Sequence, residues 1–228
     1  LQVVDAAADL VEHPAGGFGA AAGVVRAALA EPLDAESDVA LAVRWAALLH
    51  DVAKPETRAV FDDGHIGFPG HAQLGAEVAD RILERLRAST ALRRCVAVLV
   101  REHLRLGFLV SAGEPDPREV HRYRVATEPH GIASVVVSLA DRWSTRGTRA
   151  RQRWIRRHTE LAERMALALA EPVPAPLVRG DRLAEALGCA PGPEIGALLA
   201  RIAEEQAAGV VGSEDEAIAF ARAARASG

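Results

Sequence analysis

The sequence predicts an all-α protein, a compact helical bundle followed by a short helical tail. Long stretches rich in alanine and leucine place apolar residues at i, i+3 and i+4, and few runs alternate as a half-buried strand does. Hydrophobic residues make up 50% of the 228 residues, enough for a substantial core. Aromatic residues make up only 4%, so we expect that core to consist mainly of Ala, Leu and Val.

This periodicity predicts eight helices in a first domain spanning residues 1–172. The predicted helices are 3–12, 19–31, 38–53, 71–88, 90–106, 117–127, 130–146 and 149–171. The stretch EPVPAPLVRGD, residues 171–181, holds three prolines within six residues, which a helix interior does not tolerate. We therefore expect a linker there and a separate tail over residues 173–228.

Start and stop signals predict three short helices in the tail. Asp181 opens the stretch DRLAEALG as a cap and Gly188 closes it. Pro193 suits the first turn of the next helix. Ser213 and Glu216, three residues apart, form a capping box in front of the last helix.

The apolar runs, the cysteines and the start of the chain narrow the class of protein. No apolar run approaches the roughly 18 residues of a membrane span, and no basic-then-apolar signal segment opens the chain, so we expect a cytoplasmic protein without a membrane partner. Cys95 and Cys189 lie far apart in no CxxC spacing, which predicts reduced core residues. The first residue is Leu rather than Met, as in a fragment of a longer polypeptide.

Five ionisable residues interrupt apolar helical stretches and could carry chemistry. His50 and Asp51 end LAVRWAALLHD, His71 opens a predicted helix, and His103 and Asp141 lie in CVAVLVREHLRL and IASVVVSLADRW. Burying any of them without a partner costs several kcal/mol. Convergence on one divalent cation would explain all five, and imidazole with carboxylate suits Zn, Mn, Fe or Ni, while an oxygen-weighted set admits Mg.

Each of these residues also has a purely structural interpretation. A single histidine on an apolar helix, such as His71 or His103, is often a hydrogen-bonded core residue. Asp141 is harder to explain in this way, because aspartate is almost never buried unpaired. Lys54 is the only lysine among 27 basic residues, and it either stabilises a helix end by its charge or contacts a phosphate.

The order of these motifs resembles the HD-domain phosphohydrolase superfamily. HDVAKP at 50–55, GHAQLGA, REHLRL and LADRWSTR carry the resemblance. They resemble most closely the HD domain that follows the catalytic head of bacterial CCA-adding tRNA nucleotidyltransferases and poly(A) polymerases. The tail, from VRGDRLAEALG to DEAIAFA, is similar to the segment after that domain, so the resemblance covers about residues 15–222.

The resemblance implies a set of metal ligands. His50, Asp51 and Asp141 would bind a divalent metal, and His71 and His103 would bind a second metal or face a phosphate. Catalysis would then rest on Asp51, Lys54, His71 and His103.

The resemblance also implies a further histidine ligand on the helix before His50. Aligning His13–Pro14 with the HP that often precedes that helix puts Ala21 at the ligand position, so that one ligand is lost. Aligning Glu12–His13 directly with the family's E-H pair makes His13 the ligand instead, with Pro14 and two glycines following where a helix should continue.

Arginines dominate the segment after Asp141. RWSTRGTRARQRWIRR, residues 142–157, holds seven arginines and no acid. A phosphate-backbone track leading to the site, with Trp143 and Trp154 stacking on bases, is one interpretation. A solvated helix face that offsets the acidic N-terminal helices is the other. The residues that we expect to contact phosphate or RNA are Lys54, Arg58, Arg142, Arg146 and Arg149.

Three functions are compatible with these patterns. The first is a metal-dependent phosphohydrolase acting on a nucleotide, a cyclic phosphodiester or an RNA 3′ end. The second is a non-catalytic tRNA-binding body segment of a CCA-adding enzyme or poly(A) polymerase with a degenerate metal site. The third is a helical scaffold. The chain shows no pattern of a nucleotidyltransferase head, which would have to be supplied by the same or another polypeptide.

Overall fold

The computed structural model describes residues 2–110, 115–146 and 152–226, and it confirms the all-α prediction. The chain divides into two compact units. Unit 1 comprises residues 1–114 and 123–171, and unit 2 comprises residues 115–122 and 172–228. No helix in the described part of the chain is long and apolar enough to cross a membrane.

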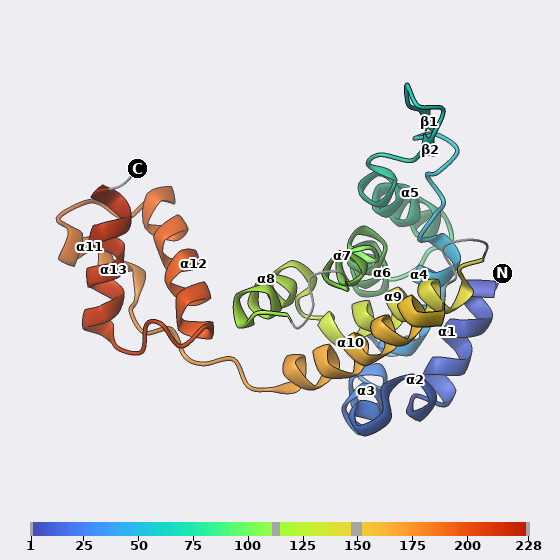
Figure 1. Ribbon diagram of the computed structural model, residues 1–228, viewed down its shortest axis with the longest axis horizontal. Helices are drawn as coiled ribbons and strands as arrows, with labels where there is room; N and C mark the ends of the chain where they lie inside the picture. Colours follow the sequence, from blue (N-terminus) through green and yellow to red (C-terminus); the bar gives the residue numbers. More distant parts are fainter. Residues whose placement is uncertain (1, 111–114, 147–151, 227–228) are drawn as a thin grey trace. The chain divides into compact units, whose positions relative to one another are not determined.

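Unit 1 is a helical bundle arranged around one central helix (Figure 1). Its helices are α1 (Gln2–Glu12), α2 (Ala15–Phe18), α3 (Ala22–Leu29), α4 (Val39–Leu49), α5 (His71–Arg85), α6 (Thr90–Glu102), α7 (Arg105–Leu109), the end of α8 (Pro117–Thr127), α9 (Gly131–Ser144) and α10 (Gln152–Ala170). Helix α9 packs against α1, α3, α4, α6, α7 and α10, and its residues 133–140 are all buried. A helix that is buried on every side belongs in the core of its domain. Asp141 follows directly at the end of this buried run of α9.

The largest departures from the predicted helices affect three of them. The expected helix 19–31 is a short 3₁₀ turn, η1 (Gly19–Ala21), followed by α3. Gly19 at its start has a positive φ of 42°, which lies outside the helical region. The expected helix 38–53 ends at Leu49, and 90–106 ends at Glu102 before the separate helix α7. In the tail, α11 begins at Gly180 rather than after an Asp181 cap.

A small antiparallel hairpin between α4 and α5 was missed by the sequence analysis. Strand β1 (Ala59–Val60) pairs with β2 (Ile66–Gly67) in the register Ala59 to Gly67 and Val60 to Ile66. Strands of two residues are too short to show an alternating pattern, so only the turn signal DDG could have revealed them. The hairpin extends beyond the start of α5 (Figure 1).

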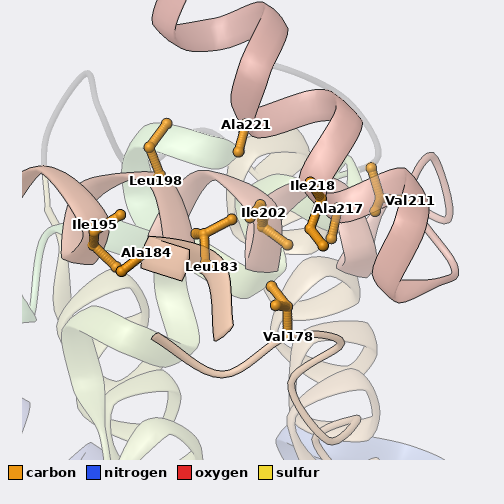
Figure 2. Packing of buried hydrophobic residues seen from close by; sticks show 10 residues of the cluster. All are labelled: Val178, Leu183, Ala184, Ile195, Leu198, Ile202, Val211, Ala217, Ile218 and Ala221. Carbon is orange, nitrogen blue, oxygen red and sulfur yellow. The ribbon is translucent and has the colours of Figure 1, made fainter. Parts of the chain in front are cut away.

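Unit 2 is a three-helix cluster with its own apolar core. It contains α11 (Gly180–Leu187), α12 (Pro193–Ala207) and α13 (Glu214–Ala226). Figure 2 shows the buried side chains of this core, from Val178 on the approach to α11 to Ala221 on α13. The first residues of α8 join this unit through two ion pairs with α12, Arg118 with Glu205 at 2.7 Å and Arg122 with Glu204 at 2.8 Å.

Candidate metal centre

A tight turn at the end of α4 brings Asp51 into the middle of a cluster of charged side chains. His50 closes α4, and its backbone N–H still donates to Ala46. The next backbone bonds, Val52 to Leu49 at 3.0 Å and Lys54 to Asp51 at 3.0 Å, span only three residues. This tighter winding places the Lys54 ammonium 2.6 Å from Asp51 Oδ2.

The three histidines around Asp51 all stand at helix ends and share one orientation. His50 and His103 cap α4 and α6, and His71 opens α5. The Nδ1 atom of each ring lies near the carbonyl three residues earlier, at 2.9 Å for His50, 2.7 Å for His71 and 2.7 Å for His103. A carbonyl only accepts, so Nδ1 is the protonated nitrogen in each ring and Nε2 faces Asp51.

Two imidazoles meet one carboxylate oxygen, forming what we name the Oδ1 side of the centre. Asp51 Oδ1 lies 3.4 Å from His71 Nε2 and 3.9 Å from His103 Nε2, and one ligand atom from each residue lies within 4.8 Å of the others. Asp51 Oδ1 and His71 Nε2 are buried and have no hydrogen-bond partner. Buried polar atoms rarely remain unsatisfied, so a divalent cation fits these residues.

The opposite oxygen has quite different neighbours, which we name the Oδ2 side. Besides Lys54, Asp51 Oδ2 lies 3.2 Å from His50 Nε2, which in turn lies 3.6 Å from Asp141 Oδ1. Burial opposes protonation of His50, but the hydrogen bonds with Asp141 and Asp51 outweigh it and raise the pKa of His50 to about 9. Without a bound metal, His50 is therefore a cation between two carboxylates.

The two sides differ in charge. Burial raises the pKa of the Asp51 carboxyl, but the His50 and Lys54 cations outweigh it and keep that pKa far below its usual range. Burial lowers the pKa of His103 to about 4, so this imidazole is neutral and offers a lone pair. The Oδ1 side thus presents the neutral imidazole of His103, whereas the Oδ2 side already contains two positive charges.

One buried histidine next to this centre was missed by the sequence analysis. His158 on α10 accepts from Arg142 Nε at 3.4 Å through Nδ1, and its Nε2 lies 3.2 Å from Ser138 Oγ. It begins the buried face of α10, and this spacing could have revealed it: His158, Leu161, Ala162, Met165, Ala166 and Leu169. Burial and the Arg142 charge lower the pKa of His158 to about 4, so both ring nitrogens are engaged in a neutral ring.

The remaining predicted site residues do not join the ligand group found among the described residues. Arg142 is half-buried and turned toward His158, and Arg58 and Arg146 are exposed. Arg149 lies outside the described residues. Ala21 is buried at the end of η1, and His13 is exposed after α1.

The arginines of α10 surround one tryptophan. The guanidinium groups of Arg153 and Arg157 lie 5.3 Å and 5.2 Å from the Trp154 ring, a cation–π arrangement. Trp143 donates from Nε1 to Thr159 at 3.1 Å. This hydrogen bond ties Trp143 to α10. Of the two predicted stacking residues, Trp154 is therefore the better candidate, because two guanidinium groups flank its ring.

Two tRNA nucleotidyltransferases are similar to most of this chain. The chain is 37% identical over 197 residues to an A-adding tRNA nucleotidyltransferase of Deinococcus radiodurans, covering 85% of this chain and 44% of that protein. It is 38% identical over 185 residues to a CC-adding tRNA nucleotidyltransferase of Thermus thermophilus, covering 79% of this chain and 39% of that protein. The chain thus spans about two fifths of the length of these curated relatives.

The family comparison covers the whole candidate centre. The profile of the HD domain matches residues 21–146, more than half of the chain. This range contains His50, Asp51, His71, His103 and Asp141, and it begins at Ala21, the position at which the first alignment places the missing ligand. The chain belongs to the HD-domain family.

Proposed function

We propose that this protein is a metal-dependent phosphohydrolase of the HD type. The observation that carries the proposal is the Oδ1 side of the centre, where two buried atoms without partners face a third ligand atom within 4.8 Å. A divalent cation bound there would polarise a phosphoryl group and lower the pKa of an attacking water. Two imidazoles and one carboxylate favour Mn, Fe, Ni or Zn over Mg.

Each residue of the centre has a distinct role in this proposal. His71 and His103 supply nitrogen ligands, and Asp51 supplies the negative charge that offsets the cation. Lys54, whose side chain is 37% exposed, holds Asp51 Oδ2 and offers donors to a phosphate oxygen. His50 and Asp141 fix the orientation of Asp51 from the other side and form a weaker second position for a cation.

The arginines around the centre complete the proposed contacts with phosphate. Arg58 and Arg146 are exposed, so their guanidinium groups are accessible to a phosphate outside the centre. Arg142 is anchored on His158 beside Asp141, and Arg149 would extend the same basic run.

Metal analysis combined with hydrolysis of bis(p-nitrophenyl) phosphate tests this proposal. We expect about one equivalent of Mn or Zn per chain after dialysis, and turnover that depends on that metal. Asp51→Asn should lose both, whereas Asp9→Asn, an exposed aspartate on α1, should lose neither. A protein that takes up no metal at micromolar Mn or Zn would contradict the proposal.

A second function is supported by the extent of the similarity. The match with the two tRNA nucleotidyltransferases covers 85% and 79% of the chain, more than the HD profile covers. On this proposal the chain binds tRNA as the body segment of such an enzyme, with the Arg153–Trp154–Arg157 cluster contacting the RNA.

Titration of labelled tRNA distinguishes the second function from the first. Replacing Arg153 and Arg157 together by Ser should weaken tRNA binding, and the same change at Arg81 and Arg85 on α5 should not. Asp51→Asn should leave tRNA affinity intact. Absence of saturable binding to tRNA would rule out this second function.

A further inference from the structure

A cavity of about 660 Å³ lies beside the candidate metal centre. Its walls come from the β1–β2 hairpin, the start of α5, the end of α6 and α7. His71 belongs both to this wall and to the ligand group of the Oδ1 side. A molecule in the cavity therefore lies next to the position that a cation would occupy.

Five aromatic rings line the walls of this cavity. Phe61 and His65 stack on the hairpin with ring centroids 5.9 Å apart and an interplanar angle of 23°. Phe68 meets His71 edge to face at 6.5 Å, and Phe108 on α7 is 73% exposed. Three of the five phenylalanines in the chain line this one cavity, a concentration that a core of Ala, Leu and Val does not require.

The backbone of the hairpin is shaped to hold one of these rings. A Cβ atom at Gly67 would lie 2.7 Å from Phe61 Cε2, so only glycine leaves room for the ring at its present place. The backbone bond from Phe61 N–H to His65 at 2.8 Å closes the turn below it. The Phe61 ring is thus positioned by local geometry while remaining 48% exposed.

The rim of the cavity carries a net positive charge. Arg101 and Arg105 both donate to Glu102, at 3.0 Å and 2.6 Å, so one carboxylate holds two guanidinium groups. Lys54 connects the cavity with the metal centre, since its ammonium contacts Asp51 and lies 5.5 Å from the Phe68 ring. Flat aromatic surfaces with surplus cations suit a planar base attached to a phosphate.

We propose that this cavity is a base-binding subsite of the centre, in which the nucleobase of the substrate stacks against Phe61, Phe68 and Phe108. The inference rests on the proposed hydrolase function and narrows its substrate to a nucleotide or the terminal nucleotide of an RNA. The phosphate group lies toward His71 and Lys54, and Arg101 and Arg105 face the adjoining phosphate or the edge of the base.

Binding of products, without turnover, tests this subsite. Calorimetric titration of the full chain compares adenosine, guanosine, cytidine and uridine 5′-monophosphates with ribose 5-phosphate, which has the phosphate and sugar but no base. At least one nucleotide should bind roughly tenfold more tightly than ribose 5-phosphate, the preference that base stacking of about 1–3 kcal/mol provides. Replacing Phe61 and Phe108 together by Leu should bring that ratio close to one.

Phe220→Leu is the matched control, because it removes the same ring from unit 2, and its ratio should equal that of the parent protein. Equal affinity for all five ligands, or a ratio that the double variant leaves unchanged, would overturn the subsite. A metal-loaded protein that hydrolyses base-free esters but prefers no nucleotide leaves the hydrolase standing and removes the subsite. A nucleotide preference that persists in His103→Gln without metal upholds the subsite even if hydrolysis fails.

Discussion

The two oxygens of a single carboxylate, Asp51, face opposite electrostatic surroundings. On the Oδ1 side the Nε2 atoms of His71 and His103 lie 3.4 Å and 3.9 Å from an oxygen that has no hydrogen-bond partner. On the Oδ2 side the Lys54 ammonium and a protonated His50 already neutralise the charge, at 2.6 Å and 3.2 Å. The comparison teaches that the HD dipeptide alone does not define a metal site. We expect a metal on the side from which lone pairs rather than cations approach Asp51.

The largest effect on metal affinity should appear when one histidine of each side is replaced in two separate variants. His103→Gln keeps a donor for the Val100 carbonyl but loses the Nε2 lone pair, so metal affinity should fall by roughly 100-fold or more. His50→Gln should change that affinity by no more than about tenfold, because the loss of a positive charge beside Asp51 offsets the loss of a group that orients this carboxylate. Chelator competition measures both, and equal losses from the two variants would show that the sides do not differ.

Loss of the His50 charge should lower the stability of the protein in mildly alkaline solution. The pKa of His50 is raised from 6.5 to about 9, so its contribution is complete below pH 6.5 and disappears as the pH rises through 9. In metal-free protein this amounts to roughly 3 kcal/mol of the free energy of unfolding. Urea denaturation at a series of pH values measures it, and Asp141→Asn should remove about half of the dependence.

Lys54 should weaken metal binding while it assists hydrolysis. Lys54→Met removes a positive charge that contacts a ligand carboxylate, so the affinity for Mn or Zn should rise about tenfold. Turnover of bis(p-nitrophenyl) phosphate should nevertheless fall, because a donor to the phosphate is lost. Lys54→Arg, which keeps the charge, should bind the metal as the parent protein does. Weaker metal binding in Lys54→Met would contradict the assignment of Lys54 to the Oδ2 side.

The helices and the identity of the family could be predicted from the sequence because both depend on patterns within short segments. The order HD, His71, His103 and Asp141 was sufficient to predict HD-family membership, and the profile match confirms it. The roles of these residues as ligands stay predictions. The two sides of Asp51 could not be predicted, because they depend on a three-residue turn and on ring orientations fixed by backbone carbonyls.

The hairpin and His158 escaped prediction for different reasons. The strands of the hairpin are too short to create a periodic signal, although they form the wall that holds Phe61. His158 follows the helical period of α10, but a histidine on an apolar face can be structural or functional, and only its partners decide. The partners of His158, Ser138 and Arg142, lie on a different helix, so a local pattern could not reveal them.

His158 provides the last and smallest test, because it is a buried histidine with no lone pair directed at the centre. Its pKa is lowered to about 4 from 6.5, so the unfolded chain binds more protons between these values, and stability falls as the pH drops through that window. Between pH 6 and pH 5 the free energy of unfolding of the parent protein should therefore decrease. In His158→Gln this decrease should be about 1 kcal/mol smaller than in the parent protein. Its affinity for Mn or Zn should match that of the parent protein, in contrast to His103→Gln. A loss of metal affinity in His158→Gln would mean that α10 contributes to the centre, contrary to its place outside the ligand group.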